Sequence, residues 1–374
     1  MNEQLYTYSL PVLAVALFAF GLIQSFLQSP EVFKSASFRK AKLAMAFTSL
    51  FFGAVNVFEF LERLRSTETE DSLLITFGTL IIASLQAFLF TFSMLALLSN
   101  SFQKRQIRIE TATITLFTVC AIMVYLFAES IVSIVFTYVY TAFYFSQLIR
   151  YTLIFTKRYK RALNGLDNYY SGREADRMRW IRVSFFSALG VGITALALAL
   201  LPYPLFGFCC SFACLAFYGY FTIRFINYAF VFHDIEKVLE AENENSAVGA
   251  EMENGTHKTD GAGHKVNVRL TEKWLDEKQF LQPGITIDDV AKFVGTNCRY
   301  LSAYINTDKG TTFRRWINEL RLKEAQNLLR QNPSITWNEL AEHLGYADKS
   351  TLFRQIHTQS GSSPRVWKDK ILNS

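Results

Sequence analysis

The sequence predicts an all-α protein in two parts, a seven-helix transmembrane bundle followed by a C-terminal pair of helix-turn-helix units. Two observations support this division. Residues 1–233 fall into long apolar runs separated by short polar loops, whereas residues 234–374 have the composition of an ordinary soluble protein. In this second part, apolar residues return at helical spacing, and a rhythm of two short helices joined by a tight turn occurs twice.

Seven stretches in the first part are long enough to cross a bilayer, whose hydrocarbon core needs roughly 20 apolar residues per helix. They are residues 6–27, 43–61, 73–98, 111–128, 130–155, 183–201 and 205–232. Many of them contain Gly, Ser, Thr and aromatic residues, which membrane helices tolerate. Residues 1–233 are therefore predicted to form a seven-span transmembrane domain.

Lys and Arg are shared unequally among the loops, and this predicts the orientation of the chain. The loops after the first, third and fifth stretches are basic, and the fifth is the most basic. The leading segment and the loops after the fourth and sixth stretches contain neither residue, and acidic residues outnumber the two Arg of the second loop. Because basic loops stay in the cytoplasm, the N-terminus is predicted outside. An odd number of spans then places the C-terminus in the cytoplasm.

Polar residues within the apolar stretches are candidates for recognising a signal, because such groups are costly in a bilayer. Four of them are candidate ligand contacts: Asn56, Glu59, Gln86 and Tyr138. For each one taken singly, helix packing, a hydrogen bond to a neighbouring helix or an interfacial position is the favoured alternative. Arg150 and Arg224 lie toward the inner ends of their stretches, and we expect their side chains to extend to the lipid phosphates.

Residues 234–267 are predicted to be a short helical stub and a flexible linker. Phe232, Ile235, Val238 and Leu239 share one helical face, which is a candidate for pairing with a second copy of the chain. From 241 to 265, Glu, Asn, Gly and Ala dominate and large apolar residues are almost absent, a composition typical of a disordered tether.

Residues 268–374 carry the start and stop signals of two helix-turn-helix units. Thr286 is spaced as the N-cap of a capping box, Gly295 ends that helix, and Asn297 can cap the next one. The same pattern recurs over residues 334–356. In a helix-turn-helix unit, the second helix enters the major groove of DNA. The repeated pattern therefore predicts two groove-entering helices.

A long amphipathic segment, Thr311 to Gln331, joins the two helix-turn-helix units, and its sequence resembles that of a known family. The run from Gly310 to Leu329, with Phe313, Trp316, Ile317, Arg321 and Ala325, is similar to the linker of the AraC/XylS family of bacterial transcription regulators. Leu340-Ala341, Leu344-Gly345-Tyr346, Ser350, Arg354 and Gly361-x-Ser363-Pro364-x-x-Trp367 resemble the second unit of that family. The resemblance covers residues 268–370 with its spacing retained.

That resemblance implies a double helix-turn-helix DNA-binding domain, with its two recognition helices in successive major grooves about 34 Å apart. With its apolar first part, the chain also resembles the membrane-bound members known from Bacteroidetes-type bacteria, which implies the bacterial inner membrane as its location. Candidate DNA contacts carried over from the family are Cys298, Arg299, Tyr300, Ser302 and Ala303 in the first unit and Lys349, Ser350, Thr351, Arg354 and His357 in the second. Arg299 and Arg354 are favoured, since a guanidinium can bind guanine with two hydrogen bonds.

The remaining positive groups are expected to touch phosphates, which positions a protein without specifying a sequence. They are Arg314, Arg315 and Lys368, and His357 is expected to act in the same way. Three residues depart from the family pattern. Thr296 stands where an apolar residue is usual, Ala303 where a longer polar one is common, and Phe353 where a small or polar one is common.

Together these features imply a membrane-bound one-component transcription regulator, whose transmembrane part senses a small molecule or an envelope signal. The expected partners are promoter DNA, the lipid bilayer and a second copy of the chain, with RNA polymerase as a further candidate. Two alternatives stay open: a transporter-like membrane module with an attached regulator, or a constitutive regulator that is only anchored. No catalytic residue, cofactor or metal is predicted, because there is no Gly-rich phosphate loop, metal-ligand spacing or nucleophile–His pairing.

Overall fold

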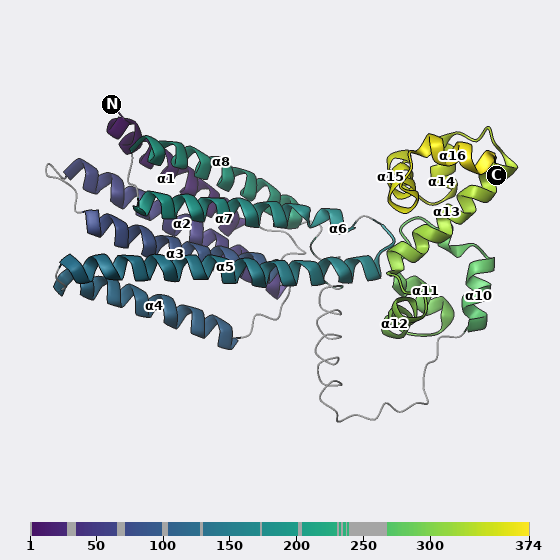
Figure 1. The fold of residues 1–374 in the computed structure, drawn as a ribbon, viewed down its shortest axis with the longest axis horizontal. Coiled ribbons are helices and arrows are strands. Elements are labelled where there is room, and N and C mark those ends of the chain that lie inside the picture. The colour runs from purple at the N-terminus through teal and green to yellow at the C-terminus, as the bar shows by residue number, and fades with distance from the viewer. Residues whose placement is uncertain are drawn as a thin grey trace, which may run out of the picture. The chain divides into compact units, whose positions relative to one another are not determined.

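The protein is seen here in a computed structural model, which describes residues 2–27, 35–65, 72–98, 104–127, 130–172, 174–200, 204–229, 232, 235–236, 238 and 268–373. Every named element is a helix (Figure 1). Within those ranges, β-structure is limited to one isolated antiparallel bridge between Tyr170 and Thr286. The chain divides into two compact units. The first unit is Met1–Ala162 with Arg177–Asn243, and the second unit is Leu163–Asp176 with Glu244–Ser374.

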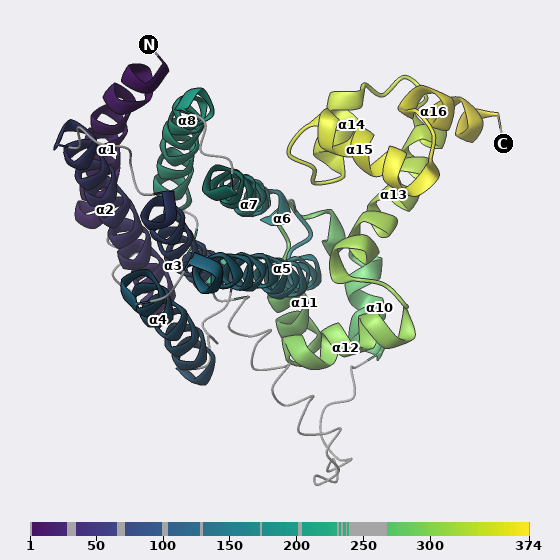
Figure 2. The same cartoon turned by 60° about the vertical axis from the view of Figure 1, so that its left-hand side comes forward.

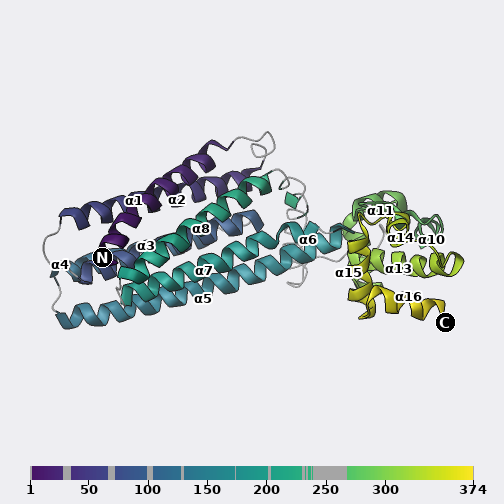
Figure 3. The same cartoon turned by 90° about the horizontal axis from the view of Figure 1, so that it is seen from above.

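The first unit is a bundle of long helices that run side by side (Figure 3). Its helices are α1 (Asn2–Phe26), α2 (Ala36–Arg65), α3 (Ser72–Leu98), α4 (Lys104–Phe127), most of α5 (Ser130–Tyr169), α7 (Arg179–Leu200) and α8 (Pro204–Ala229). Helix α1 packs against α2 and α8, and α3 packs against α2, α4 and α7. Many large apolar side chains stay exposed on the outside of this bundle, including Val15, Phe58 and Leu126. An apolar outer surface of this kind is suited to lipid rather than water.

Six of these helices are long and apolar enough to cross a membrane: α1, α2, α3, α4, α5 and α8. The predicted stretch 183–201 coincides with α7, which packs against α3 and α8 but is not among the six. Several side chains in the last two turns of α7 lie outside the described residues. The apolar helical bundle is confirmed, and the count of seven spans stays a prediction.

Helix α5 is much longer than the stretch 130–155 that the apolar pattern predicts, because it continues without a break to Tyr169. Half of the added residues, Thr156 to Tyr169, are the good helix formers Lys, Arg, Leu and Ala, so polarity ends the apolar run without ending the helix. The last seven residues of α5 belong to the second unit. Helix α6 (Glu174–Arg177) follows after a short turn.

Arg150 does not behave as the sequence predicts. Its Nη2 lies 2.6 Å from Oε2 of Glu110, and the Glu110 side chain is only 5% exposed. The hydroxyl of Tyr151 donates to the same carboxylate oxygen at 3.1 Å. A buried carboxylate needs a cation and hydrogen-bond donors to offset its desolvation. The expectation that Arg150 extends to lipid phosphates is therefore corrected: it pairs with Glu110.

The apolar face predicted for the stub after the last span is already covered within one chain. Of its four residues, Leu239 lies outside the described residues. Phe232, Ile235 and Val238 are each at most 3% exposed, and the Phe232 ring packs on Phe38 with centroids 5.3 Å apart. This packing removes the basis for pairing two stubs across a dimer. The tether predicted over residues 241–265 lies outside the described residues.

The second unit consists of short helices arranged around one long helix. Residues 268–373 form α10 (Val268–Asp276), the 3-10 turn η1 (Gln279–Leu281), α11 (Ile287–Val294), α12 (Cys298–Asp308), α13 (Phe313–Gln331), α14 (Trp337–His343), α15 (Lys349–Ser360) and α16 (Pro364–Leu372). Figure 2 shows α13 running from the group formed by α10–α12 to the group formed by α14–α16. Each group has its own apolar core, and α13 contributes side chains to both.

The predicted helix signals are confirmed in both groups. The Thr286 side chain accepts a hydrogen bond from the Asp289 backbone, and Asp289 accepts one from the Thr286 backbone, which completes a capping box. Gly295 ends α11 with φ 70°, and Asn297 caps α12. In the second group, Thr336 forms an equivalent capping box at the start of α14. Local sequence therefore sets the ends of these helices.

Arg321 on α13 fastens the two groups together. Its side chain is 3% exposed and donates to three backbone carbonyls, of Phe280 at 2.8 Å, Gln282 at 2.7 Å and Gly345 at 3.1 Å. Gly345 has φ 71°, and a Cβ added there would lie 2.0 Å from the Leu281 carbonyl oxygen. The close approach of these backbones requires glycine. The spacing of the two helix-turn-helix units thus depends on one buried guanidinium.

Candidate nucleic-acid interface

The second helix of each helix-turn-helix unit presents polar side chains on an exposed face. On α12, Arg299, Tyr300 and Ala303 are exposed and Ser302 is half-buried, while Leu301 and Ile305 anchor the opposite face in the core. On α15, Lys349, Ser350, Arg354 and His357 are exposed and Thr351 is half-buried, while Leu352 and Ile356 are anchored. Helical periodicity accounts for this division, because residues three and four apart share a face. The faces left open are the ones the sequence assigns to DNA.

Two of the ten candidate DNA contacts, Cys298 and Thr351, form side-chain hydrogen bonds within their own helix-turn-helix unit. The Cys298 thiol lies 3.3 Å from Oδ1 of Asp288, and burial together with this carboxylate raises its pKa to about 11. The Thr351 hydroxyl donates to the N-cap carboxylate of Asp348 at 3.0 Å. Both groups are committed to local hydrogen bonds. Among the candidates on α12, Arg299 is exposed, and none of the ion pairs between described residues involves it.

Two of the three departures from the family pattern, Phe353 and Thr296, can be related to their local packing. Phe353 packs edge-on against Trp337 of α14, with ring centroids 5.1 Å apart, so a packing contact replaces the usual small or polar residue. Thr296 follows Gly295 in the turn, and its Oγ1 is buried without a hydrogen-bond partner among the described residues. An apolar side chain would satisfy that site better, since an unpaired buried hydroxyl is destabilising.

Three of the four groups expected to touch phosphates, Arg314, Arg315 and Lys368, already have partners within the second unit. Nε of Arg315 lies 3.0 Å from Glu319 one turn along α13, and Nζ of Lys368 lies 5.5 Å from the centre of the Trp337 ring. Nη1 of Arg314 lies 2.9 Å from Oδ1 of Asp167, close to the end of α5. Any contact of these groups with phosphate has to compete with these interactions.

Residues 163–176, here called the α5–α6 segment, form part of the second unit and dock on its first helix-turn-helix. Tyr169 packs against the core of the α10–α12 group. Tyr170 forms the isolated bridge with Thr286, and Ser171, only 5% exposed, donates both its hydroxyl at 2.6 Å and its amide at 3.3 Å to the Ile285 carbonyl. These contacts fix the segment at the N-terminal end of α11.

The α5–α6 segment also engages one of the two arginines favoured for reading bases. Oδ2 of Asp176 lies 3.5 Å from Nη1 of Arg354, with the two side chains 60% and 55% exposed. Asp167 pairs with Arg314 at the other end of the segment. Both carboxylates offset the positive charge of the arginines that they face. Asp167, Ser171 and Asp176 carry no pattern in the sequence that marks them, beyond lying in a basic loop, and only the tertiary structure shows what they contact.

The four candidate ligand contacts of the first unit are not gathered at one place. Nδ2 of Asn56 donates to the Phe52 carbonyl of its own helix at 2.7 Å. Glu59 accepts from Tyr6 at 2.8 Å and pairs with Arg63 at 3.3 Å. Tyr138 is 67% exposed on the outside of the bundle. Gln86 lines a cavity between α3, α5, α7 and α8.

A pair of helix-turn-helix units joined by one long helix, each with a polar face on its second helix, defines a double helix-turn-helix DNA-binding domain. Residues 290–370 match the family described as the helix-turn-helix domain. This part of the chain is an AraC-type helix-turn-helix domain of the kind found in transcription regulators. The resemblance inferred from the sequence is thereby confirmed.

One similar protein is the raffinose operon transcriptional regulatory protein of Pediococcus pentosaceus. The two are 28% identical over 111 residues, which make up 28% of this chain and 39% of that protein. The similarity thus spans well under half of the relative. No solved structure matches the chain.

Proposed function

We propose that this protein is a membrane-bound one-component transcription regulator that binds promoter DNA through its C-terminal domain and responds to a signal received by its apolar helical bundle. The AraC-type domain supports the DNA-binding half of this proposal. Six apolar helices support insertion of the other half in a membrane. The alternation of basic and non-basic loops supports a cytoplasmic C-terminus, where the domain would meet DNA.

The observation that carries the coupling of the two halves is the α5–α6 segment. Helix α5 is continuous from Ser130 to Tyr169, with its first part in the apolar bundle and its last seven residues in the second unit. A change in the bundle that shifts or twists α5 would act on the contacts of Tyr169, Ser171 and Asp176. We infer that release of these contacts frees the DNA-reading face. The signal would then bias a two-state equilibrium between docked and released forms.

The proposed base contacts are led by Arg299 and Arg354, with Tyr300, Ser302, Ala303, Lys349 and Ser350 beside them on the two open helix faces. The second unit has sixteen Lys and Arg against twelve Asp and Glu between residues 268 and 374. This modest excess supports weak binding by one copy, with an affinity that falls as salt rises. Two copies on one promoter would raise the effective concentration, which supports a dimer on DNA.

DNA binding is tested with the whole chain in lipid nanodiscs by selecting genomic fragments at low salt. We expect a small set of fragments to be enriched, and Arg299→Ala to weaken binding to them about five- to a hundredfold, as loss of one bidentate base contact does. Lys273→Ala is the matched control, because Lys273 lies on α10, outside α12 and α15, and pairs with Glu277 just after that helix. Enrichment of no fragment above unrelated DNA would count against the proposal.

Membrane topology is tested separately with reporters. A fusion after Ser374 should be active if the reporter works only in the cytoplasm and silent if it works only in the periplasm. The reverse pattern would contradict the orientation. Replacing the apolar bundle by an unrelated membrane span should abolish the response to signal while leaving DNA binding. A chain that regulates normally after this replacement would be a constitutive, merely anchored regulator.

A further inference from the structure

A cavity opens inside the first unit between α3, α5, α7 and α8. Its volume is about 60 Å³, and it is partly open to the surface. Most of its lining is apolar or aromatic, including Phe90, Phe185 and Phe217. An apolar lining with a few polar groups is the usual form of small-molecule sites.

One polar group on this lining is buried without a hydrogen-bond partner among the described residues, Nε2 of Gln86. By contrast, two tyrosines of the lining are satisfied: Tyr144 donates to the Gly192 carbonyl at 3.1 Å, and Tyr151 bonds Glu110 and Gln147. Buried polar groups are rarely left unpaired, so the Gln86 amide calls for an occupant of the cavity.

The chemistry of the lining defines that occupant. No charged residue lines the cavity, and the nearby carboxylate of Glu110 is already held by Arg150 and Tyr151. A charged ligand would therefore lose its hydration without gaining a counter-charge. The Gln86 amide nitrogen is a donor only, so it requires an acceptor such as a carbonyl oxygen. The aromatic walls favour flat apolar groups.

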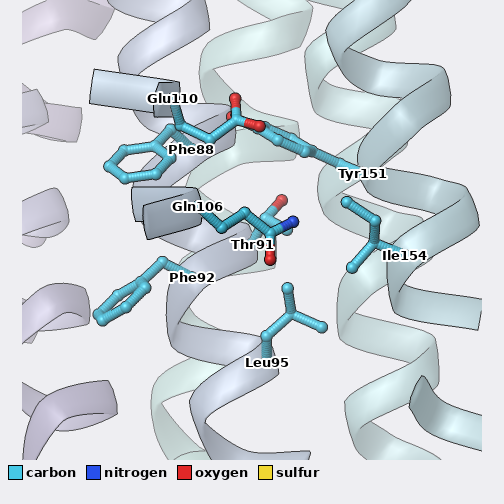
Figure 4. A pocket seen from close by; sticks show the side chains of 8 residues that line it. All are labelled: Phe88, Thr91, Phe92, Leu95, Gln106, Glu110, Tyr151 and Ile154. Atoms are coloured by element: carbon cyan, nitrogen blue, oxygen red, sulfur yellow. The ribbon is translucent and has the colours of Figure 1, made fainter. Parts of the chain in front are cut away.

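We propose that this cavity binds a neutral, mainly aromatic or aliphatic small molecule that carries a carbonyl-type acceptor for Gln86. The inference deepens the proposed function, since it gives the chemical class of the signal. Thr91 and Tyr151 also line a second, smaller pocket beside Glu110, seen in Figure 4, where Tyr151 and Glu110 lie against each other. An occupant touching Tyr151 thus contacts α5, the helix that continues to the α5–α6 segment.

The geometry around Gly192 belongs to the same site. A Cβ on Gly192 would lie 2.9 Å from the Tyr144 hydroxyl, so only glycine lets that ring lie against α7. With its hydroxyl bonded to the Gly192 carbonyl, the Tyr144 ring forms part of the cavity wall. The cavity therefore depends on a specific close approach of α5 and α7.

Benzophenone is a suitable probe, because it is neutral, has two aromatic rings and one carbonyl acceptor, and labels its contacts under light. Its excited carbonyl takes a hydrogen atom from a nearby C–H bond, and the two radicals combine in a new C–C bond. The whole chain in nanodiscs is irradiated with benzophenone, and labelled peptides are identified by mass spectrometry. We expect saturable labelling of peptides from α3, α5, α7 or α8 that line the cavity, displaced by excess non-photoreactive benzanilide.

Two variants test the site independently. Gln86→Leu should weaken labelling about fivefold, as loss of one hydrogen bond does. Ala188→Phe should fill the cavity and abolish labelling, whereas Ala112→Phe, on an exposed position of α4, should leave it unchanged. Thermal unfolding of each variant in nanodiscs checks that the bundle is intact. Labelling that is unsaturable, confined to outward-facing residues or indifferent to Ala188→Phe would overturn the proposal.

Failure of this site and failure of the proposed function are distinguishable, because labelling is measured without DNA. A chain that binds promoter fragments but shows no saturable labelling would refute the cavity proposal alone. Saturable labelling with no selective DNA binding would support the cavity and refute the regulator.

Discussion

The ion pair between Asp176 and Arg354 makes the strongest prediction about control of DNA binding. Its atoms are 3.5 Å apart and both side chains are more than half exposed, so solvent screening limits its free energy to about 0.2–1 kcal/mol. The pair of Asp167 with Arg314 is shorter, 2.9 Å, and less exposed, at 35% and 23%, so it should fall at the upper end of that range. Neutralising both carboxylates should therefore weaken docking of the α5–α6 segment by up to about 2 kcal/mol.

Asp176→Asn should therefore raise DNA affinity about two- to fivefold without signal, and the double variant with Asp167→Asn about tenfold or more. The gain should shrink as salt rises, since exposed charges are screened within about 10 Å at 0.1 M salt. The assay is fluorescence anisotropy of a labelled promoter fragment with the whole chain in nanodiscs. Its matched control is Glu277→Gln, which removes the same charge from the pair that Glu277 forms with Lys273 at the end of α10.

An equal gain from Glu277→Gln would mean that net charge alone explains the effect. Unchanged or weaker binding by the double variant would refute the idea that the α5–α6 segment restrains the DNA-reading face. Ser171→Ala offers a second check, since it removes the hydroxyl bonded to Ile285 without altering charge. Like Asp176→Asn, it should raise the affinity for DNA.

Three further predictions concern the second unit. Arg321→Met should lower its free energy of unfolding by at least about 3 kcal/mol, because three buried carbonyls lose their donor, and hydrogen exchange over α13 measures this loss. Thr296→Val should instead raise stability by about 1 kcal/mol by removing an unpaired buried hydroxyl, and a lowered unfolding midpoint would contradict that account. The pKa of Cys298, raised to about 11, means that the folded unit keeps this thiol protonated where the unfolded chain, with a pKa of about 8.5, loses the proton. The stability it contributes should be complete below about pH 8.5 and fall as pH rises toward 11, while Cys298→Ser should flatten that dependence.

The local features of the chain could be read from the sequence because they depend on neighbouring residues. The capping box at Thr286 and the left-handed Gly295 each involve only a few consecutive residues, and both are present as predicted. Apolar runs likewise marked the helices of the bundle. The end of α5 was harder to predict, because hydropathy reports where lipid contact ends and does not report where a helix ends.

The partners of charged and polar side chains were decided by tertiary structure. Arg150 could be placed near the end of a span from the sequence, but its partner Glu110 lies forty residues away on another helix. The same holds for Gln86, which is one of several amides in apolar runs and is distinguished only by the cavity it lines.

By itself, the sequence determined the all-α class, the apolar bundle and the paired helix-turn-helix units, since these follow from periodicity and from capping within short windows. Only the tertiary structure decided that Arg321 joins the two helix-turn-helix units and that Asp176 faces Arg354. The physical reason is that a hydrogen bond or an ion pair requires approach within a few ångströms. Residues far apart in the chain meet at that distance only after the helices have packed.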